Sequence, residues 1–84
     1  MVKKAVALKY EPERDNAPRV VAKGQGLLAE KILALARENG VPIKEDASLV
    51  EALSRLEVEA EVPQELYEAV ATVLAWAWHL NQKA

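Results

Sequence analysis

The feature that most constrains the fold of this chain is a pair of glycines between an apolar run and a helix-like segment. The stretch VVAKGQGLLA, residues 20–29, passes from two valines through Gly24 and Gly26 into a leucine-rich segment. Glycine adopts backbone conformations that other residues avoid, so Gly24 and Gly26 predict a tight strand-to-helix turn. The same order, a strand, Gly-x-Gly-x-x-Ala and a helix, is also typical of the start of a dinucleotide-binding fold.

Apolar periodicity on both sides of the turn predicts a small α/β domain. The expected elements are strands at 4–10, 19–22 and 41–45, a helix at 27–39, a helix carrying residues 49–56 and a last helix from Pro63. A strand–helix–strand order implies a parallel pair with a right-handed crossover. We therefore predict one domain, 1–84, with a small three-stranded mixed sheet packed with about three helices in the order β-β-α-β-α-α.

Three local signals refine the helices. Leucines 28 and 35, with Ile32 and Ala36, recur at helical spacing after the turn. Ser48 and Glu51 have the spacing of a capping box and are predicted to begin the second helix. His79 stands alone near the end of the last helix, and one histidine without cysteines makes neither a metal set nor a catalytic triad.

Composition excludes several classes of function. The chain has 84 residues, no cysteine and a net charge of −2. Thiol catalysis and cysteine-based zinc sites are therefore excluded, and a nucleic-acid partner bound through its phosphates is disfavoured. No segment approaches the roughly 20 apolar residues that span a bilayer. We expect a soluble cytoplasmic domain without catalytic residues, cofactor or metal.

The residues alone leave two interpretations of the glycine turn open. A nucleotide site would use the N–H groups at the helix start for phosphate, and Glu45 lies about 20 residues later, where an acid meets a ribose hydroxyl. In the structural interpretation Gly24 and Gly26 only reverse the chain and let the helix lie close to the sheet. A single crossover leaves little wall for a nucleotide, which favours the structural interpretation.

A longer stretch carries a family resemblance. The segment AVALKYEPERDNAPRVVAKGQGLLAEKI, residues 5–32, closely resembles the cytoplasmic domain of the FlhB/YscU family, the export-switch proteins of type III secretion. The segments ENGVPIKED, 38–46, and VPQELYEAVATVLAWAW, 62–78, resemble the same domain in the same order, and the flagellar branch is nearer than the virulence branch. The resemblance implies a structural Lys-Gly-x-Gly turn and a non-enzymatic protein-interaction module of the export apparatus.

The chain also departs from the pattern of that family. Family members carry a transmembrane region and an Asn-Pro-Thr-His motif before this domain, and asparagine cyclisation cuts the backbone within the motif. Residues Met1–Lys4 contain no Asn-Pro, so self-cleavage is not carried over. We interpret the chain as a stand-alone counterpart of the cleaved C-terminal piece. It would lack one strand of the family's sheet, and the open edge would be available for pairing with another chain or for homo-oligomerisation.

The resemblance also implies a docking patch for export substrates. The positions that match the family's apolar patch are Ala17, Pro18, Ala71 and Leu74, and the alternative is ordinary packing of a loop on a helix. The implied function is to supply or mimic the cleaved domain in substrate recognition and specificity switching, at the export apparatus on the inner membrane. The implied partners are membrane-bound export proteins and export substrates or the ruler protein. A second interpretation is a regulator or decoy that binds substrates or the ruler protein away from the apparatus.

Overall fold

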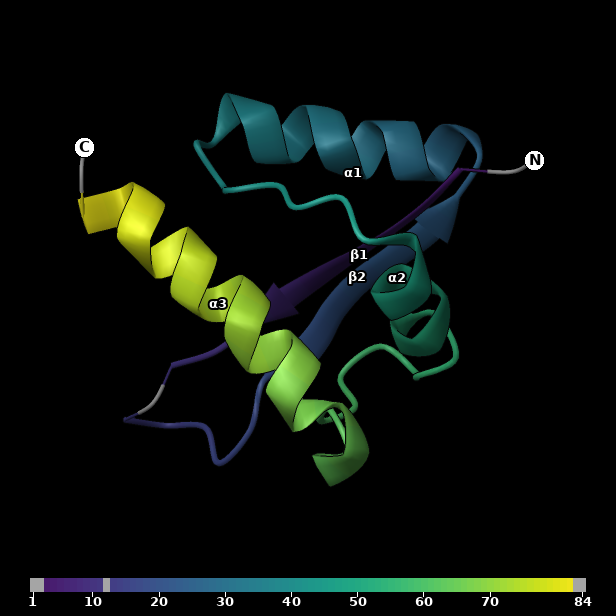
Figure 1. Cartoon of the computed structure of the whole chain (residues 1–84). Coiled ribbons are helices and arrows are strands. Elements are labelled where there is room, and N and C mark those ends of the chain that lie inside the picture. The colour runs from purple at the N-terminus through teal and green to yellow at the C-terminus, as the bar shows by residue number, and fades with distance from the viewer. Residues whose placement is uncertain (1–2, 12, 83–84) are drawn as a thin grey trace.

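A computed structural model describes residues 3–11 and 13–82, and for 75–82 it describes the backbone alone, so the side chain of His79 lies outside the described part. Its elements are β1 (Lys4–Lys9), β2 (Arg19–Gln25), α1 (Leu27–Glu38), α2 (Ala47–Leu53), the 3₁₀ turn η1 (Gln64–Leu66) and α3 (Tyr67–Gln82). Figure 1 shows the two strands lying between α1 and the pair formed by α2 and α3. This is the predicted small α/β fold with three helices.

The sheet consists of β1 and β2, paired antiparallel. The register runs from Lys4 opposite Gln25 to Lys9 opposite Arg19, with an irregularity after Ala7. Successive side chains of a strand point to opposite faces of the sheet. Accordingly Val6 and Leu8 pack against the core formed with α2 and α3, as the period-two pattern predicted.

The main core lies between the strands and the last two helices. Its buried members are Leu49, Leu53, Val62 and Val70, and the half-buried side chains packed against them are Val6, Leu8, Leu56, Leu66, Val73 and Leu74. On the other face of the sheet, α1 buries Ala29 completely. The small side chain of Ala29 lets the helix axis approach the strands closely.

The predicted third strand at 41–45 is wrong. Residues 41–46 are irregular, and the sheet in the described part of the chain has two strands. Gly40 ends α1 with a φ of 67°, and the N–H of Val41 closes the helix end by donating to Ala36 O at 2.8 Å. Pro42 then lacks the N–H that a strand ladder needs. The predicted parallel crossover is therefore absent, and the order is β-β-α-α-α.

Residues 59–62, which include two glutamates, lie beside β2. Val20 N donates to Ala60 O at 3.0 Å, and Glu59 N donates to Val20 O at 2.7 Å. Val62 N donates to Pro18 O at 2.8 Å, and Arg19 and Glu61 form an isolated antiparallel bridge between this hydrogen bond and that of Val20 N. The outer edge of β2 is thus covered over the Arg19–Val20 stretch, whereas β1 has no strand beside its outer edge in the described chain.

The start of α2 also differs from the prediction. Asp46, in extended conformation, is the N-cap, and its Oδ1 accepts a hydrogen bond from Leu49 N at 3.0 Å. The helix therefore begins at Ala47, and Ser48 lies inside it rather than at its cap. An aspartate satisfies a free N–H at a helix start as well as a serine does, so the earlier of the two capping residues takes the position.

Candidate functional site

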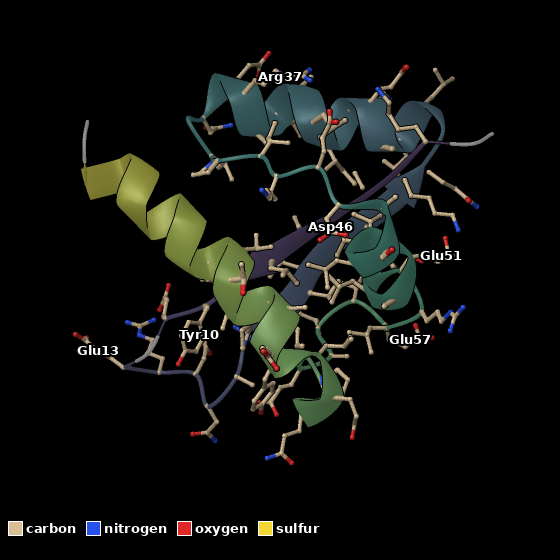
Figure 2. The ribbon with its side chains drawn as sticks, in the orientation of Figure 1. Tyr10, Glu13, Arg37, Asp46, Glu51 and Glu57 are labelled. Atoms are coloured by element: carbon tan, nitrogen blue, oxygen red, sulfur yellow. The ribbon has the colours of Figure 1, made fainter. Side chains whose placement is uncertain are left out.

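A groove of about 170 Å³ lies where the β1–β2 connection meets the first turns of α3. It is lined by Tyr10, Asn16, Pro18, Tyr67, Val70, Ala71 and Leu74. Figure 2 shows the Tyr10 side chain between the connecting loop and α3. Segments about 50 residues apart in the chain therefore form its two walls.

The loop wall is held by a compact set of hydrogen bonds around Asp15. The Asp15 carboxylate accepts from Glu11 N at 2.9 Å, while Asp15 N donates back to Glu11 O at 2.7 Å. The Arg19 guanidinium lies 3.8 Å from Asp15 and 3.6 Å from Glu59, on the segment that covers β2. These reciprocal contacts fix the end of the loop and hence the position of Pro18, one residue before β2.

The helical wall follows from side-chain spacing along α3. Tyr67, Ala71 and Leu74 lie four and three residues apart, so they line up on one side of the helix. Val70 lies between that side and the core and is 1% exposed, which makes it the floor of the groove. Tyr67 is 42% exposed and Tyr10 is 39% exposed, so both rings are open to a binding partner.

The structure brings three of the four predicted patch residues together. Pro18, Ala71 and Leu74 all line the groove. Ala17 does not, because it is 2% exposed and packed beneath the loop. Pro18 is partly exposed and faces the groove, whereas Ala17 is not accessible to a ligand.

Sequence reasoning missed the two tyrosines. Tyr10 continues the period-two face of Val6 and Leu8 beyond the end of β1, and that continuation was visible in the sequence. Tyr67 shares the helical spacing of Ala71 and Leu74, so it could have been added to the patch from the spacing alone. Neither the sequence pattern nor the spacing indicates that Tyr10 lies opposite α3.

The glycine turn is structural. Gly26 has a φ of 63°, and its N–H donates to Lys3 O at 2.8 Å, which closes the turn. A Cβ on Gly24 would lie 2.5 Å from Leu28 Cγ and 3.0 Å from Leu28 Cβ. Gly24 is thus required by the close approach of β2 and α1. The nucleotide alternative lacks its structural setting, because in the described residues Glu45 lies on no strand and no β-α-β unit forms.

The other charged groups near the groove are surface pairs. A polar hollow lined by Tyr10, Glu11, Glu13 and Arg14 adjoins the groove at Tyr10. In it the Glu11 carboxylate lies 3.6 Å from Arg14 Nε. Among the described side chains no cluster of three histidines, cysteines, aspartates or glutamates could hold a metal ion.

Among the described titratable groups, Glu51 has a displaced pKa, and it does not line the groove. The Lys4 ammonium donates to a Glu51 carboxylate oxygen at 2.7 Å and attracts its negative charge, which lowers the pKa of Glu51 below its ordinary value of 4.5. This pair joins β1 to α2 at the surface. It supports the fold and has no part in the groove.

Comparison with known proteins decides the family. The model of the FlhB HrpN YscU SpaS family matches residues 2–77. The chain belongs to this family. Among its relatives, the uncharacterized protein YlqH of Bacillus subtilis (strain 168) is 43% identical over 81 residues, which cover 96% of this chain and 87% of YlqH. The flagellar biosynthetic protein FlhB of Escherichia coli (strain K12) is 47% identical over 79 residues.

The coverage of these relatives differs. The match takes up 93% of this chain but 21% of the length of E. coli FlhB. Solved domains of the family share the fold. The cytoplasmic domain of FlhB from Shewanella putrefaciens superimposes with a TM-score of 0.91 at 38% identity, covering 95% of this chain and 63% of that one. The PscU C-terminal domain superimposes with a TM-score of 0.82 at 31% identity, and the match covers 87% of this chain and 94% of the PscU domain.

These findings confirm the predicted resemblance to the cytoplasmic domains of export-switch proteins. Flagellar FlhB proteins are among the relatives of the chain. In the described part of the chain, no helix has the length and apolar character needed to cross a membrane.

Proposed function

We propose that this chain is a non-enzymatic interaction module of the flagellar type III export apparatus. In this role it stands in for the C-terminal cytoplasmic domain of FlhB and docks short apolar segments of export substrates in the groove. The observation that carries the proposal is the groove between the loop and α3, because it gathers Pro18, Ala71 and Leu74 on one accessible surface. Family membership supplies the biological setting.

The size of the groove favours a peptide over a small molecule. Pockets for drug-sized ligands and cofactors usually measure about 300–1,000 Å³ and enclose most of the ligand. A groove of about 170 Å³ has room for one or two side chains of a longer segment. Its apolar floor selects an aliphatic or aromatic side chain, because burying apolar surface is favourable and an unpaired polar group there would be costly.

The two tyrosines extend this surface to the backbone of a docked segment. Each phenol has an apolar ring and a hydroxyl that donates and accepts, so it can pack on a side chain and bond to a peptide group. The Asn16 amide adds a second polar group at the loop side. Apolar floor and polar rim together are the usual anatomy of a site that recognises a segment of protein.

Two alanines on α3 allow a matched test of the groove. Ala71 and Ala69 are both exposed on the same helix, and Ala71 lines the groove whereas Ala69 does not. The probes are labelled peptides from the N-terminal segments of rod and hook export substrates, and binding is followed by fluorescence anisotropy. We expect Ala71→Asp to weaken binding at least about tenfold, because it places an unpaired carboxylate in an apolar contact.

Ala69→Asp is the control for Ala71→Asp. Ala69→Asp adds the same charge to the same helix and should leave the affinity within about twofold, since surface changes away from a contact are nearly neutral. Equal loss in both variants would assign the effect to helix stability or net charge. Wild-type protein that binds none of the peptides would contradict substrate docking.

We further propose that the open edge of β1 attaches the chain to a membrane-bound export protein by strand addition. An edge strand without a neighbour offers its N–H and C=O groups to an extended segment. The covered edge of β2 leaves β1 as the available side of the sheet. A proline at Val6, Val6→Pro, removes one N–H of β1. The control is Val58→Pro, because Val58 lies outside any strand and follows Glu57 in the turn that Ala60 N closes on Glu57 O, a position that favours proline.

Capture of a membrane-bound export protein by the wild-type chain and by Val58→Pro, but not by a folded Val6→Pro variant, would support strand addition. Capture by all three would refute it. A chain that binds substrate peptides but no membrane-bound export protein would instead act as the regulator or decoy of the alternative interpretation.

A further inference from the structure

A second apolar surface lies on α1, remote from the groove. Leu27, Leu28 and Leu35 are 79%, 53% and 58% exposed, and Val41, just beyond the helix, is 53% exposed. Figure 1 shows α1 at the edge of the molecule, with the strands on one side of it. A surface helix normally carries polar residues on its outer side. These four side chains with Lys31, Ala34 and Glu38 are named the α1 face.

The α1 face carries one positive and one negative charge in a definite arrangement. Lys31 and Glu38 are seven residues apart, about two turns, and so lie on nearly the same line along the helix. Both side chains are exposed, and neither side chain forms a hydrogen bond or an ion pair with the described residues. If a second copy of the helix lies antiparallel against the first, the positive charge of each copy meets the negative charge of the other.

The spacing of these residues fits a two-fold axis across α1 between Ala34 and Leu35. Lys31 and Glu38 are each 3.5 residues from that point, about 5 Å along the helix at the usual rise. In an antiparallel pair, the ammonium of each copy therefore lies level with the carboxylate of the other. By the same symmetry Leu35 lies level with Ala34.

We propose that the α1 face is a self-association interface, in which two copies of the chain pair through antiparallel α1 helices. A two-fold interface uses the same patch on both copies, so the patch must complement itself. The α1 face meets that condition in both its apolar residues and its charges. The inference is independent of the function proposed for the groove, which α1 does not line.

The expected dimer is weak. The chain exposes 6333 Å², and a standard interface removes about 800 Å² from each partner. The α1 helix has 12 residues, so a contact between two α1 helices buries less than about 800 Å² of surface on each copy. An interface of that size is typical of transient association. Association is therefore best measured by sedimentation velocity from about 5 to about 500 µM, where weak dimers become populated.

Charge reversal tests the interface without depending on a leucine substitution. Lys31→Glu places like charges opposite one another twice per dimer, so we expect at least about tenfold weaker association. The double variant Lys31→Glu with Glu38→Lys restores opposite charges and should recover the wild-type dissociation constant within about threefold. Glu30 and Arg37 are an exposed acid–base pair with the same spacing on the opposite flank, so Arg37→Glu is the matched control and should change little.

Circular dichroism on each variant establishes that the fold is retained. Leu35→Glu should give a folded monomer over the whole concentration range. A wild-type chain that stays monomeric throughout would overturn the proposal, as would a dimer that persists in Leu35→Glu or is insensitive to charge reversal at Lys31. Loss in the double variant equal to that in Lys31→Glu would also overturn it.

Discussion

The contact between Gly24 and Leu28 gives the sharpest prediction about the fold. A Cβ added at Gly24 would lie 2.5 Å from Leu28 Cγ, 2.8 Å from Cδ2 and 3.0 Å from Cβ. The Cγ and Cδ2 contacts are far too short and require Leu28 to change its rotamer or α1 to move, whereas the Cβ contact needs a shift of only a few tenths of an ångström. Gly24→Ala must therefore displace the Leu28 side chain or α1, and overpacking of this kind costs about 1–3 kcal/mol of unfolding free energy.

The partner substitution separates sterics from every other effect. Leu28 is 53% exposed, so Leu28→Ala should cost about 1 kcal/mol, roughly half the value for a fully buried leucine. In the double variant the Cγ and Cδ2 contacts are gone and only a shift of a few tenths of an ångström remains. We expect the double variant to cost about 1 kcal/mol as well, so the coupling between the two sites is about 1–3 kcal/mol.

The assay is urea denaturation of the four proteins, monitored by circular dichroism with shared slopes. Alanine also lowers the entropy of the unfolded chain, which opposes the steric cost by about 0.4–1 kcal/mol. A Gly24→Ala protein about 0.4–1 kcal/mol more stable than wild type would refute the steric explanation, because it would show the entropic gain with no steric cost. Strictly additive single substitutions would refute it too, because they would place the cost of Gly24→Ala away from Leu28.

Three further predictions concern stability. Asp46→Ala removes the acceptor for Leu49 N and should lower the unfolding free energy by about 1 kcal/mol in urea. Val70→Ala empties the floor of the groove and should cost about 2 kcal/mol in the same assay. The lowered pKa of Glu51 means that its pairing with Lys4 stabilises the fold above about pH 4.5 and that this stabilisation is lost as the pH falls through the lowered pKa, so Glu51→Gln should be less stable than wild type at pH 7 and the difference should shrink as the pH falls below about 4.5.

Local features of the fold were predictable because their causes are local. The alternation of Val6 and Leu8 fixes a strand face, and the leucine-rich run after the turn makes a helix. The role of the glycines was also predictable in kind, since a turn between strand and helix needs a positive φ, which Gly26 adopts. The particular need for Gly24 depends on where Leu28 lies once the helix has packed.

The failed predictions depended on choices between distant partners. Val41 and Ile43 have the residue types of a strand, but a strand also needs a neighbour with free backbone groups. Part of the edge of β2 is occupied by residues 59–62, which the sequence marks only as acidic. Leu28 and Leu35 have helical spacing but lie outside, because the smaller Ala29 faces the sheet.

The groove was predictable only in part, and for the same reason. Its helical wall follows from spacing along α3, whereas its loop wall depends on which way each residue points after the hydrogen bonds around Asp15 have formed. Ala17 and Pro18 are neighbours in sequence, yet one is buried and the other lines the groove. A pattern of residue types does not contain that distinction.

The measurement that tests the central claim most directly is a titration of the ¹⁵N-labelled chain with an export-substrate peptide, followed in ¹H–¹⁵N correlation spectra. Docking in the groove predicts that the largest shift changes fall on the amides of Tyr10, Asn16, Ala71 and Leu74, with small changes along α1. Changes centred on the glycine turn or α1, or no change at saturating peptide, would contradict the claim that the groove between the loop and α3 is the docking site.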